Sequence, residues 1–440
     1  MDADRWTKLP VLEVADDRTE IMRLVEDTFT AEWLNSGSLP VNPLQQLWQT
    51  AGHVQATELY ILGKTLKHIK PLMSPRAWGT IERYIKGNDE GLRAGAMFEL
   101  VSALLVTSPG QQVSMPPSGQ PGYDILVKVG NKSLRISCKA LLPSVHERKF
   151  NSFAVLVQGV MRQVAQPDRP SHMSLALLDH TDNFKYDVRI LPRFAEAYHQ
   201  WHLYPHDKPF FGHKIGGWFA QFSELGSSEL PFMPGVPSYS LLVAAEFAKD
   251  EQRRFDAKMT EAVENLGKHC RQVDNTVTNL IFIRLPNAVS LGAAKLFAAR
   301  YWEEARPAHI AGVFFFRTKV TTTRDLQTSA VTWESGGSDN PHAASPLRQI
   351  TGDQGLKMTV PFGLISDAEQ RLLLFVNGQE ALDLTFRYSL IAAQRHYDAR
   401  SLSTVEMLRL PFTATTYHLS VGQDILAFSL AEQNDELKLL

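Results

Sequence analysis

The 440-residue sequence has only two cysteines, almost no net charge and no long apolar run. Cys138 and Cys270 are too few for a disulfide framework or for a cysteine-bound zinc site. No stretch approaches the roughly 18 uninterrupted apolar residues that span a bilayer, and the first residues lack the basic and then apolar pattern of a signal peptide. We therefore expect a cytoplasmic protein that does not contact a membrane.

The charge balance argues against a protein that binds nucleic acid through a general basic surplus. Lysine and arginine together number 45 and aspartate and glutamate 47, which gives a formal net charge of -2. Free-standing nucleic-acid-binding domains usually carry a positive surplus. The sequence also lacks a G-x-x-x-x-G-K-S/T loop that would bind triphosphates, so nothing in it supports NTP hydrolysis.

The pattern of apolar and turn-forming residues predicts an α/β protein of several parts. Apolar residues recur near every 3.6 positions in "LQQLWQTAGHVQATELYILGKTLKHI", and helical and strand-like segments alternate after residue 256. We expect a helical N-terminal region over 1–88, an α/β core over 89–333 with an aromatic-, proline- and glycine-rich insertion at about 181–250, a linker or flexible loop over 334–357, and a β-containing region over 358–440.

The stretch "PGYDILVKVGNKSLRISCKA", residues 121–140, is typical of a β-hairpin. If Gly130-Asn131 forms a two-residue turn, the numbers of paired residues sum to 261, and Asp124 lies opposite Ser137. Side chains alternate between the faces of a strand, so Lys139 shares the face of Ser137. The apolar side chains of the hairpin, together with Cys138, take the other face. The hairpin therefore presents a carboxylate, a hydroxyl and an ammonium group together.

The helix predicted before this hairpin, "NDEGLRAGAMFELVSALLVTSPG", carries a second acidic candidate, Glu99. Its neighbours three and four positions away are all small: Gly95, Ala96, Ser102 and Ala103. Small neighbours allow another element to pack closely, which would hold the Glu99 carboxylate near the polar face of the hairpin. The alternative is an exposed glutamate that simply favours the helix.

A helix with "FEL", a strand that opens at "GYD" and a strand that ends in "ISCK" together resemble the PD-(D/E)XK nuclease superfamily, which has the restriction-endonuclease-like fold. The resemblance covers about residues 89–165. It implies a mixed sheet flanked by helices, and a site in which Glu99, Asp124 and the carbonyl of Cys138 bind Mg²⁺ or Mn²⁺ and Lys139 assists the hydrolysis of a phosphodiester, with DNA the expected substrate.

One position departs from the family pattern. Ser137 stands where the family usually has Asp or Glu, although some members have serine there and a glutamate supplied from elsewhere. Glu147 is the nearest glutamate after Lys139. The helix "FAVLVQGVMRQV" adds Gln158, which is suited to hold a phosphate or a metal-bound water or is an ordinary polar residue of a partly buried helix.

Metal-dependent hydrolysis of a phosphodiester requires these residue types together. Mg²⁺ prefers oxygen ligands from carboxylates, polarises a phosphate and lowers the pKa of a bound water, and an ammonium group stabilises developing negative charge. We therefore expect a metal-dependent nuclease, and the family's usual setting suggests a bacterial defence system. The alternative is an inactive protein of the same fold that binds protein or nucleic acid within a larger complex, because Ser137 has replaced the acid.

Overall fold

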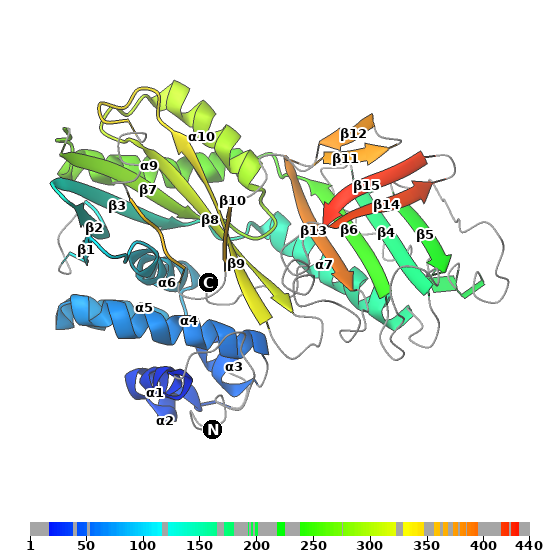
Figure 1. The fold of residues 1–440 in the computed structure, drawn as a ribbon, viewed down its shortest axis with the longest axis horizontal. Helices are drawn as coiled ribbons and strands as arrows, with labels where there is room; N and C mark the ends of the chain where they lie inside the picture. Colours follow the sequence, from blue (N-terminus) through cyan, green and yellow to red (C-terminus); the bar gives the residue numbers. More distant parts are fainter. Residues whose placement is uncertain are drawn as a thin grey trace.

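The structure, a computed structural model, is a mixed α/β protein whose described strands form three sheets. Figure 1 shows two lobes side by side: one holds a seven-stranded sheet between helices, and the other holds two four-stranded sheets. The structure describes residues 17–37, 42–50, 53–116, 122–164, 171–179, 192, 195–196, 199–200, 218–224, 238–274, 276–322, 329–346, 356–360, 364–367, 373–376, 379–383, 385–394, 415–421 and 424–430.

The seven-stranded sheet is mixed and brings together strands that are far apart in the sequence. Its order is β1-β2-β3-β7-β8-β9-β10. Strand β2 is antiparallel to its neighbours β1 and β3, and β7 and β8 continue the sheet parallel to β3. At the other edge, β9 is antiparallel to β8, and β10 is parallel to β9. The strands are β1 Gln111–Ser114, β2 Ile125–Val129, β3 Lys132–Ala140, β7 Val277–Arg284, β8 Gly312–Thr322, β9 Ser329–Asp339 and β10 Leu364–Asp367.

Helices cover both faces of this sheet, as parallel neighbouring strands require. On one face lie α4 (His53–Ile69) and α6 (Glu90–Leu105), and on the other lie α9 (Glu251–His269) and α10 (Leu291–Ala305) (Figure 1). The side chains of β7 alternate between the two cores: Leu280 and Phe282 pack on the α6 side, whereas Ile281 and Ile283 pack on the α9 side. Such a strand is apolar throughout because both of its faces are buried.

The described N-terminal part is helical and packs on α6 through α4. It shares a single apolar core with the α6 face of the sheet. Side-chain caps begin three of its helices: Thr30 Oγ1 accepts from the Trp33 amide at 3.3 Å, Asn42 Oδ1 from the Leu44 amide at 2.9 Å, and Ser74 Oγ from the Ala77 amide at 3.2 Å. Its remaining elements are α1 Arg18–Phe29, α2 Ala31–Leu34, α3 Pro43–Gln49, the 3₁₀ turn η2 Lys70–Leu72 and α5 Pro75–Lys86.

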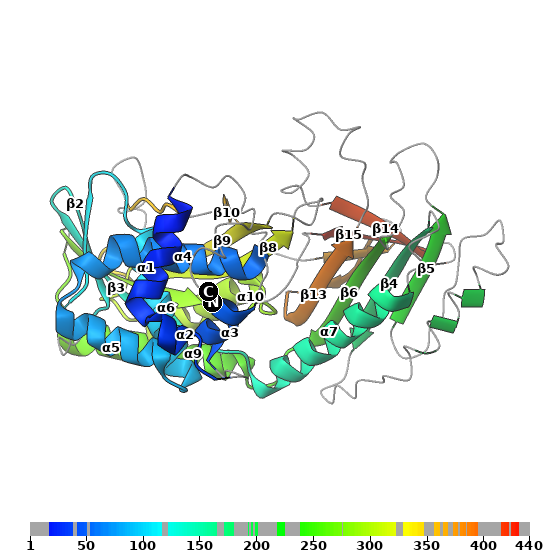
Figure 2. The ribbon, with the colours of Figure 1, turned by 90° about the horizontal axis from the view of Figure 1, so that it is seen from below.

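The second lobe combines strands from the middle and the end of the sequence. One sheet has the order β13-β6-β4-β5 and the other β12-β11-β15-β14. The long helix α7 (Val145–Val164) runs along the first of them (Figure 2). The strands are β4 Ser171–Asp179, β5 Trp218–Glu224, β6 Ser238–Glu246, β11 Leu373–Val376, β12 Gln379–Asp383, β13 Arg387–Gln394, β14 Thr415–Val421 and β15 Asp424–Leu430.

Much of the insertion predicted at 181–250 lies outside the described residues, although β5 and β6 fall within it. In the part of the chain that the structure describes, no helix combines the length and the apolar character needed to cross a membrane.

The predicted register of the hairpin is confirmed. Val129 pairs with Lys132 and Ile125 with Ile136, so paired numbers sum to 261. The Asp124 amide donates to the Ile136 carbonyl at 2.8 Å, which extends the pairing by one residue toward the end of β3. A two-residue turn fixes the register by local geometry alone, which is why the sequence was sufficient to predict it.

The prediction of a linker at 334–357 is wrong over its first residues, because 334–339 complete β9. The glycines that suggested a loop lie within this strand. Gly336 lies beneath the end of the Lys295 side chain of α10, because a Cβ there would be 2.8 Å from Lys295 Cε. The region after 357 is not a separate unit either: β10 joins the seven-stranded sheet, and β13 pairs with β6.

Gly122 allows the chain that leads into Asp124 to pass close to the end of α9. It has a positive φ of 122°, and a Cβ there would lie 2.6 Å from Cys270 Sγ and 2.8 Å from His269 Cβ. We expect Gly122→Ala to lower the free energy of unfolding by about 2–4 kcal/mol, measured by urea denaturation. Gly79→Ala in α5 is the control, because no atom lies within 4 Å of its added Cβ and alanine favours helix. Equal stability of the two variants would contradict the predicted close approach.

Candidate functional site

Asp124 lies directly before β2, and the backbone of β3 holds its carboxylate. Its Oδ2 accepts a hydrogen bond from the Cys138 amide at 2.6 Å and one from the Ser137 hydroxyl at 3.4 Å. Burial raises the pKa of Asp124 above its ordinary value, although these hydrogen bonds and the charge of Lys139 act in the opposite direction. The aspartate is therefore a fixed and partly desolvated acid at the open end of the hairpin.

Glu99 lies in the second half of α6, on the side that faces β3. Its neighbours Ala96, Ser102 and Ala103 are buried, which lets α6 pack closely on the strand. Burial, followed by the negative charge of Asp124, raises the pKa of Glu99 to about 8, while Lys139 lowers it. Glu99 is half-buried and is therefore not the exposed helix glutamate of the alternative, and burial favours the protonated form of its carboxyl group.

Lys139 reaches the same place from the end of β3. Its side chain is 16% exposed, and its Nζ lies 2.9 Å from Oε1 of Glu261 on α9. The other carboxylate oxygen of Glu261 is 2.9 Å from Lys258 Nζ. These hydrogen bonds lower the pKa of Glu261 although burial opposes them. Sequence reasoning missed Glu261, which is 122 positions from Lys139 and has no local motif around it.

Glu99, Asp124 and Lys139, which we call the acid–lysine cluster, act on one another electrostatically. Asp124 and Lys139 both shift the pKa of Glu99, and Lys139 and Glu261 both shift that of Asp124. Its three residues lie on α6, directly before β2 and near the end of β3. Helix α6 and these two strands lie side by side (Figure 1). The helix and the hairpin thus bring together the three side chains that the sequence singled out.

Ser137 and Cys138 belong to the site through hydrogen bonds to Asp124, and both side chains are buried. Ser137 is fully buried, because α9 packs across that face of β3. Cys138 is 5% exposed on the α6 side, where burial raises the pKa of its thiol well above the ordinary value. The role of its carbonyl as a metal ligand stays a prediction.

Two further residues do not join the acid–lysine cluster. Glu147 is fully buried in a capping box at the start of α7, where its Oε2 accepts from the Ser144 amide at 3.3 Å and its own amide donates to Ser144 Oγ at 2.9 Å. Gln158 lies in the second half of α7, which packs on β6 and β13 in the other lobe (Figure 2). Neither residue therefore supplies the group that Ser137 lacks.

The donor set is suitable for a hard divalent cation. Mg²⁺ usually takes one or two carboxylates and keeps several waters, and Glu99 and Asp124 are two desolvated carboxyl groups that would repel each other if both were ionised. A cation between them would relieve that repulsion. Within the described residues, however, no three side chains of histidine, cysteine, aspartate or glutamate are grouped to hold a metal ion. Any such site depends on two carboxylates, with backbone or water completing it.

Comparison with known proteins adds no relative: no family model, no curated protein and no solved structure matches the chain.

The raised pKa of Glu99 predicts a particular dependence of stability on pH. Between pH 4.5, the ordinary pKa of a glutamate, and about pH 8, Glu99 keeps its proton in the folded protein but loses it in the unfolded chain. This contribution to stability is present below pH 4.5 and is lost as the pH rises through 8. Glu99→Gln keeps the neutral form, so its stability relative to wild type should rise by at least about 1 kcal/mol from pH 5 to pH 8.5.

Urea denaturation of the two proteins in EDTA measures this difference, and Glu264→Gln, on the exposed face of α9, serves as the matched control. Parallel pH profiles for wild type and Glu99→Gln would contradict the burial of this carboxyl group.

Proposed function

We propose that the chain is a divalent-metal-dependent nuclease that hydrolyses phosphodiester bonds, with DNA as its substrate and a restriction-endonuclease-like core over α6, β1 to β3 and β7. The observation that carries this proposal is the convergence of the acid–lysine cluster. Glu99 comes from the helix before the sheet, Asp124 from the start of the second strand and Lys139 from the third strand. Apart from Ser137, this is the order of elements and residue types of the family pattern.

Each member of the acid–lysine cluster has a role that follows from its surroundings. Asp124, fixed by the Cys138 amide, offers a carboxylate in a constant position. The raised pKa of Glu99 favours its protonated form at neutral pH, and the binding of a cation would release that proton. A bound Mg²⁺ or Mn²⁺ supplies Lewis acidity toward the phosphate. Lys139 places an ammonium group where negative charge develops on the phosphate.

Glu261 supports Lys139 from α9, which packs on the face of β3 opposite to α6. Lysine has a flexible four-carbon side chain, and its ammonium group is useful only where it is held. The 2.9 Å contact to Glu261 restrains that group, and Lys258 in turn restrains Glu261. We assign Glu261 as a positioning residue that compensates in part for the missing acid at Ser137.

The nuclease proposal predicts cleavage that depends on the acid–lysine cluster. Supercoiled plasmid and single-stranded DNA should be cut in the presence of Mn²⁺ or Mg²⁺, and Lys139→Met should lower the rate by about 10- to 1000-fold, the usual cost of one electrostatic contact. Asp124→Asn should abolish both cleavage and Mn²⁺ binding measured by calorimetry. Lys128→Met, an exposed lysine of the same hairpin, is the matched control and should leave the rate unchanged.

Cleavage that survives both Lys139→Met and Asp124→Asn would come from another site or from a contaminant, and would remove the support for this proposal.

The positioning role of Glu261 makes a separate prediction. Glu261→Gln should lower kcat by about tenfold while leaving the affinity for Mn²⁺ unchanged, because the residue acts through Lys139 and not on the metal. Single-turnover cleavage and calorimetric Mn²⁺ titration measure the two quantities, with Glu264→Gln as the control on the same helix. A loss of Mn²⁺ affinity in Glu261→Gln would instead identify Glu261 as a ligand.

The second candidate is a catalytically inactive protein of the same architecture that binds protein or nucleic acid as part of a larger complex. Two observations favour it: Ser137 replaces the acid, and the described residues contain no group of three metal-binding side chains. It predicts that the wild-type protein cleaves no DNA with any metal tried, and that Lys139→Met alters only folding or the binding of a partner. The plasmid assay with wild-type protein therefore decides between the two candidates.

A further inference from the structure

The chain is nearly neutral as a whole, but residues 70–87 carry a local positive surplus. Four of their charged side chains are basic, Lys70, Arg76, Arg83 and Lys86, and one is acidic, Glu82, so their formal charges sum to +3. All of them except Lys70 belong to helix α5. Within that helix Glu82 neutralises Lys86, whose Nζ lies 2.7 Å from the carboxylate. The two arginines of α5 remain as a surplus that the helix does not balance.

Arg76 and Arg83 are exposed on the outer face of α5, away from the buried side chains with which the helix packs. Seven residues separate them, so they lie on one side of the helix and about 10 Å apart along its axis. Within the part of the chain that the structure describes, neither arginine forms an ion pair, and the guanidinium group of Arg83 lies 5.3 Å from the centre of the Tyr84 ring. Both guanidinium groups can therefore donate hydrogen bonds to an anion.

The surface between the two arginines is low because it contains Gly79. A Cβ at this position would meet no atom within 4 Å, so packing inside the protein does not explain the glycine. A glycine inside a helix costs about 1 kcal/mol relative to alanine. Where no packing requires it, the missing side chain still allows a ligand to approach the helix backbone closely. The outer face of α5 thus combines two fixed cations with a low strip between them.

The composition of α5 favours a duplex backbone over other anionic partners. No large apolar side chain of this helix is exposed, whereas protein interfaces and membrane-bound helices bury apolar side chains. Single strands usually bind through exposed aromatic rings, but Trp78 and Tyr84 are partly buried, and Lys70 Nζ lies 4.9 Å from the centre of the Trp78 ring. The phosphates of a duplex require neither feature, only cations in suitable positions.

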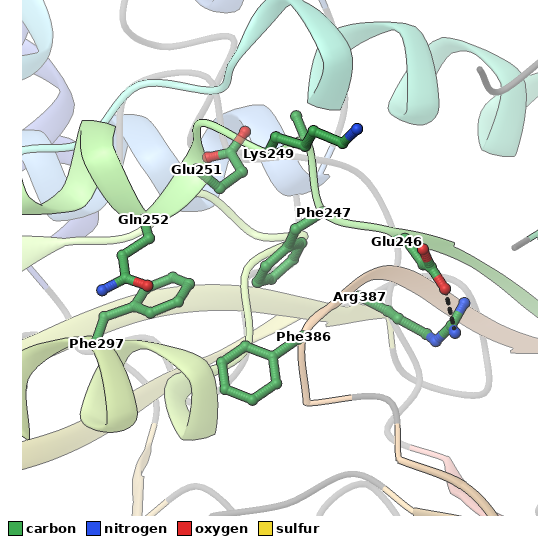
Figure 3. Close-up of a pocket in the computed structure, with 9 residues that line it drawn as sticks. Glu246, Phe247, Lys249, Glu251, Gln252, Phe297, Phe386 and Arg387 are labelled. Carbon is green, nitrogen blue, oxygen red and sulfur yellow. Dashed lines mark hydrogen bonds and ion pairs between the residues drawn. The ribbon is translucent and has the colours of Figure 1, made fainter. Parts of the chain in front are cut away.

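The cavity where the two lobes meet has no such surplus. Its volume is about 350 Å³, and the formal charges of its four charged lining residues, Glu246, Lys249, Glu251 and Arg387, sum to zero. Figure 3 shows Glu246 paired with Arg387 in its wall. The cavity therefore offers a polyanion no net attraction, in contrast to α5.

We propose that the outer face of α5 binds the phosphate backbone of duplex DNA through Arg76 and Arg83, with the backbone passing over Gly79. Each strand of a duplex carries one phosphate per about 3.4 Å of the helix axis, so the distance of about 10 Å between the arginines corresponds to about three phosphates. The choice of DNA rests on the proposed nuclease function, whereas the contact with phosphates does not.

The position of α5 is consistent with a contact to the substrate of the candidate site. Helix α5 lies at the edge of the first lobe and packs on α6, which carries Glu99 (Figure 1). A duplex held along α5 therefore lies next to the helix that contributes a carboxyl group to the acid–lysine cluster.

The test measures binding of a fluorescein-labelled duplex of about 20 base pairs to the whole protein in EDTA, where metal-dependent cleavage cannot occur. Fluorescence anisotropy gives the Kd at salt concentrations from about 50 to about 200 mM NaCl. The double variant Arg76→Gln/Arg83→Gln removes both charges, and Gly79→Leu fills the low strip with a residue that favours helix. Arg253→Gln is the matched control, because this arginine of α9 is 82% exposed. Thermal unfolding midpoints establish that the variants are folded.

Each arginine that neutralises a phosphate contributes about −0.9 to the slope of log K against log salt concentration. The double variant should therefore bind the duplex at least about tenfold more weakly at low salt, and its slope should be shallower by about 1.8. Gly79→Leu should also weaken binding, and Arg253→Gln should change neither quantity. The change in slope distinguishes a phosphate contact from a structural effect, which would leave the slope as it is.

The proposal is overturned if the wild-type protein does not bind the duplex at low salt, or if the folded double variant keeps both the affinity and the slope. It is also overturned if a single strand of the same length binds more tightly through the same arginines. Displacement of the duplex by poly-L-glutamate as effective as that by unlabelled duplex would overturn it as well, and would identify an acidic protein as the partner.

The binding assay and the nuclease assay fail independently. Metal-dependent cleavage by a protein whose duplex binding does not depend on Arg76 and Arg83 would refute the α5 contact alone. Duplex binding that depends on these arginines, without cleavage under any metal, would refute the nuclease alone.

Discussion

Burial inside a protein penalises the ionised form of a carboxyl group, and the other features of the site follow from that constraint on Glu99 and Asp124. Asp124 is the better stabilised of the two, because the Cys138 amide and the Ser137 hydroxyl donate to it. Burial, followed by the negative charge of Asp124, raises the pKa of Glu99 to about 8 and favours its protonated form at neutral pH. Lys139 lowers the pKa of both carboxyl groups, and Glu261 in turn holds Lys139. A site of this kind favours the binding of a cation.

Local chemistry made part of this site predictable from the sequence. A two-residue turn at Gly130-Asn131 fixes the register of the hairpin, and the register places Asp124 beside Ser137 and Cys138. The small residues around Glu99 indicated close packing against another element, and α6 does pack on β3. Both inferences involve residues close in sequence, where geometry leaves few alternatives.

The parts that could not be predicted depend on contacts between distant segments. Glu261 reaches Lys139 only because α9 packs across the face of β3, and that packing also buries Ser137. Gly336 is typical of a loop in the sequence, yet it lies within β9, where the strand pairs with β8 and the Lys295 side chain of α10 lies over it. The pairing of β13 with β6 brings the last part of the described chain into the second lobe, and no sequence pattern specifies that partner. In each case the decisive neighbour lies on an element far away along the chain.

Helix α9 is the element on which these distant contacts meet. At its first turn, Glu251 accepts a hydrogen bond from the Tyr388 hydroxyl of β13 and pairs with Arg254, which also donates to the Leu142 carbonyl beyond β3. Ten residues later, Glu261 holds Lys139. A helix packed along its length moves as one body, because its backbone hydrogen bonds and buried side chains resist local bending. Helix α9 therefore contacts the second lobe at its first turn and the Lys139 ammonium group ten residues later, so one rigid element sets the position of both contacts.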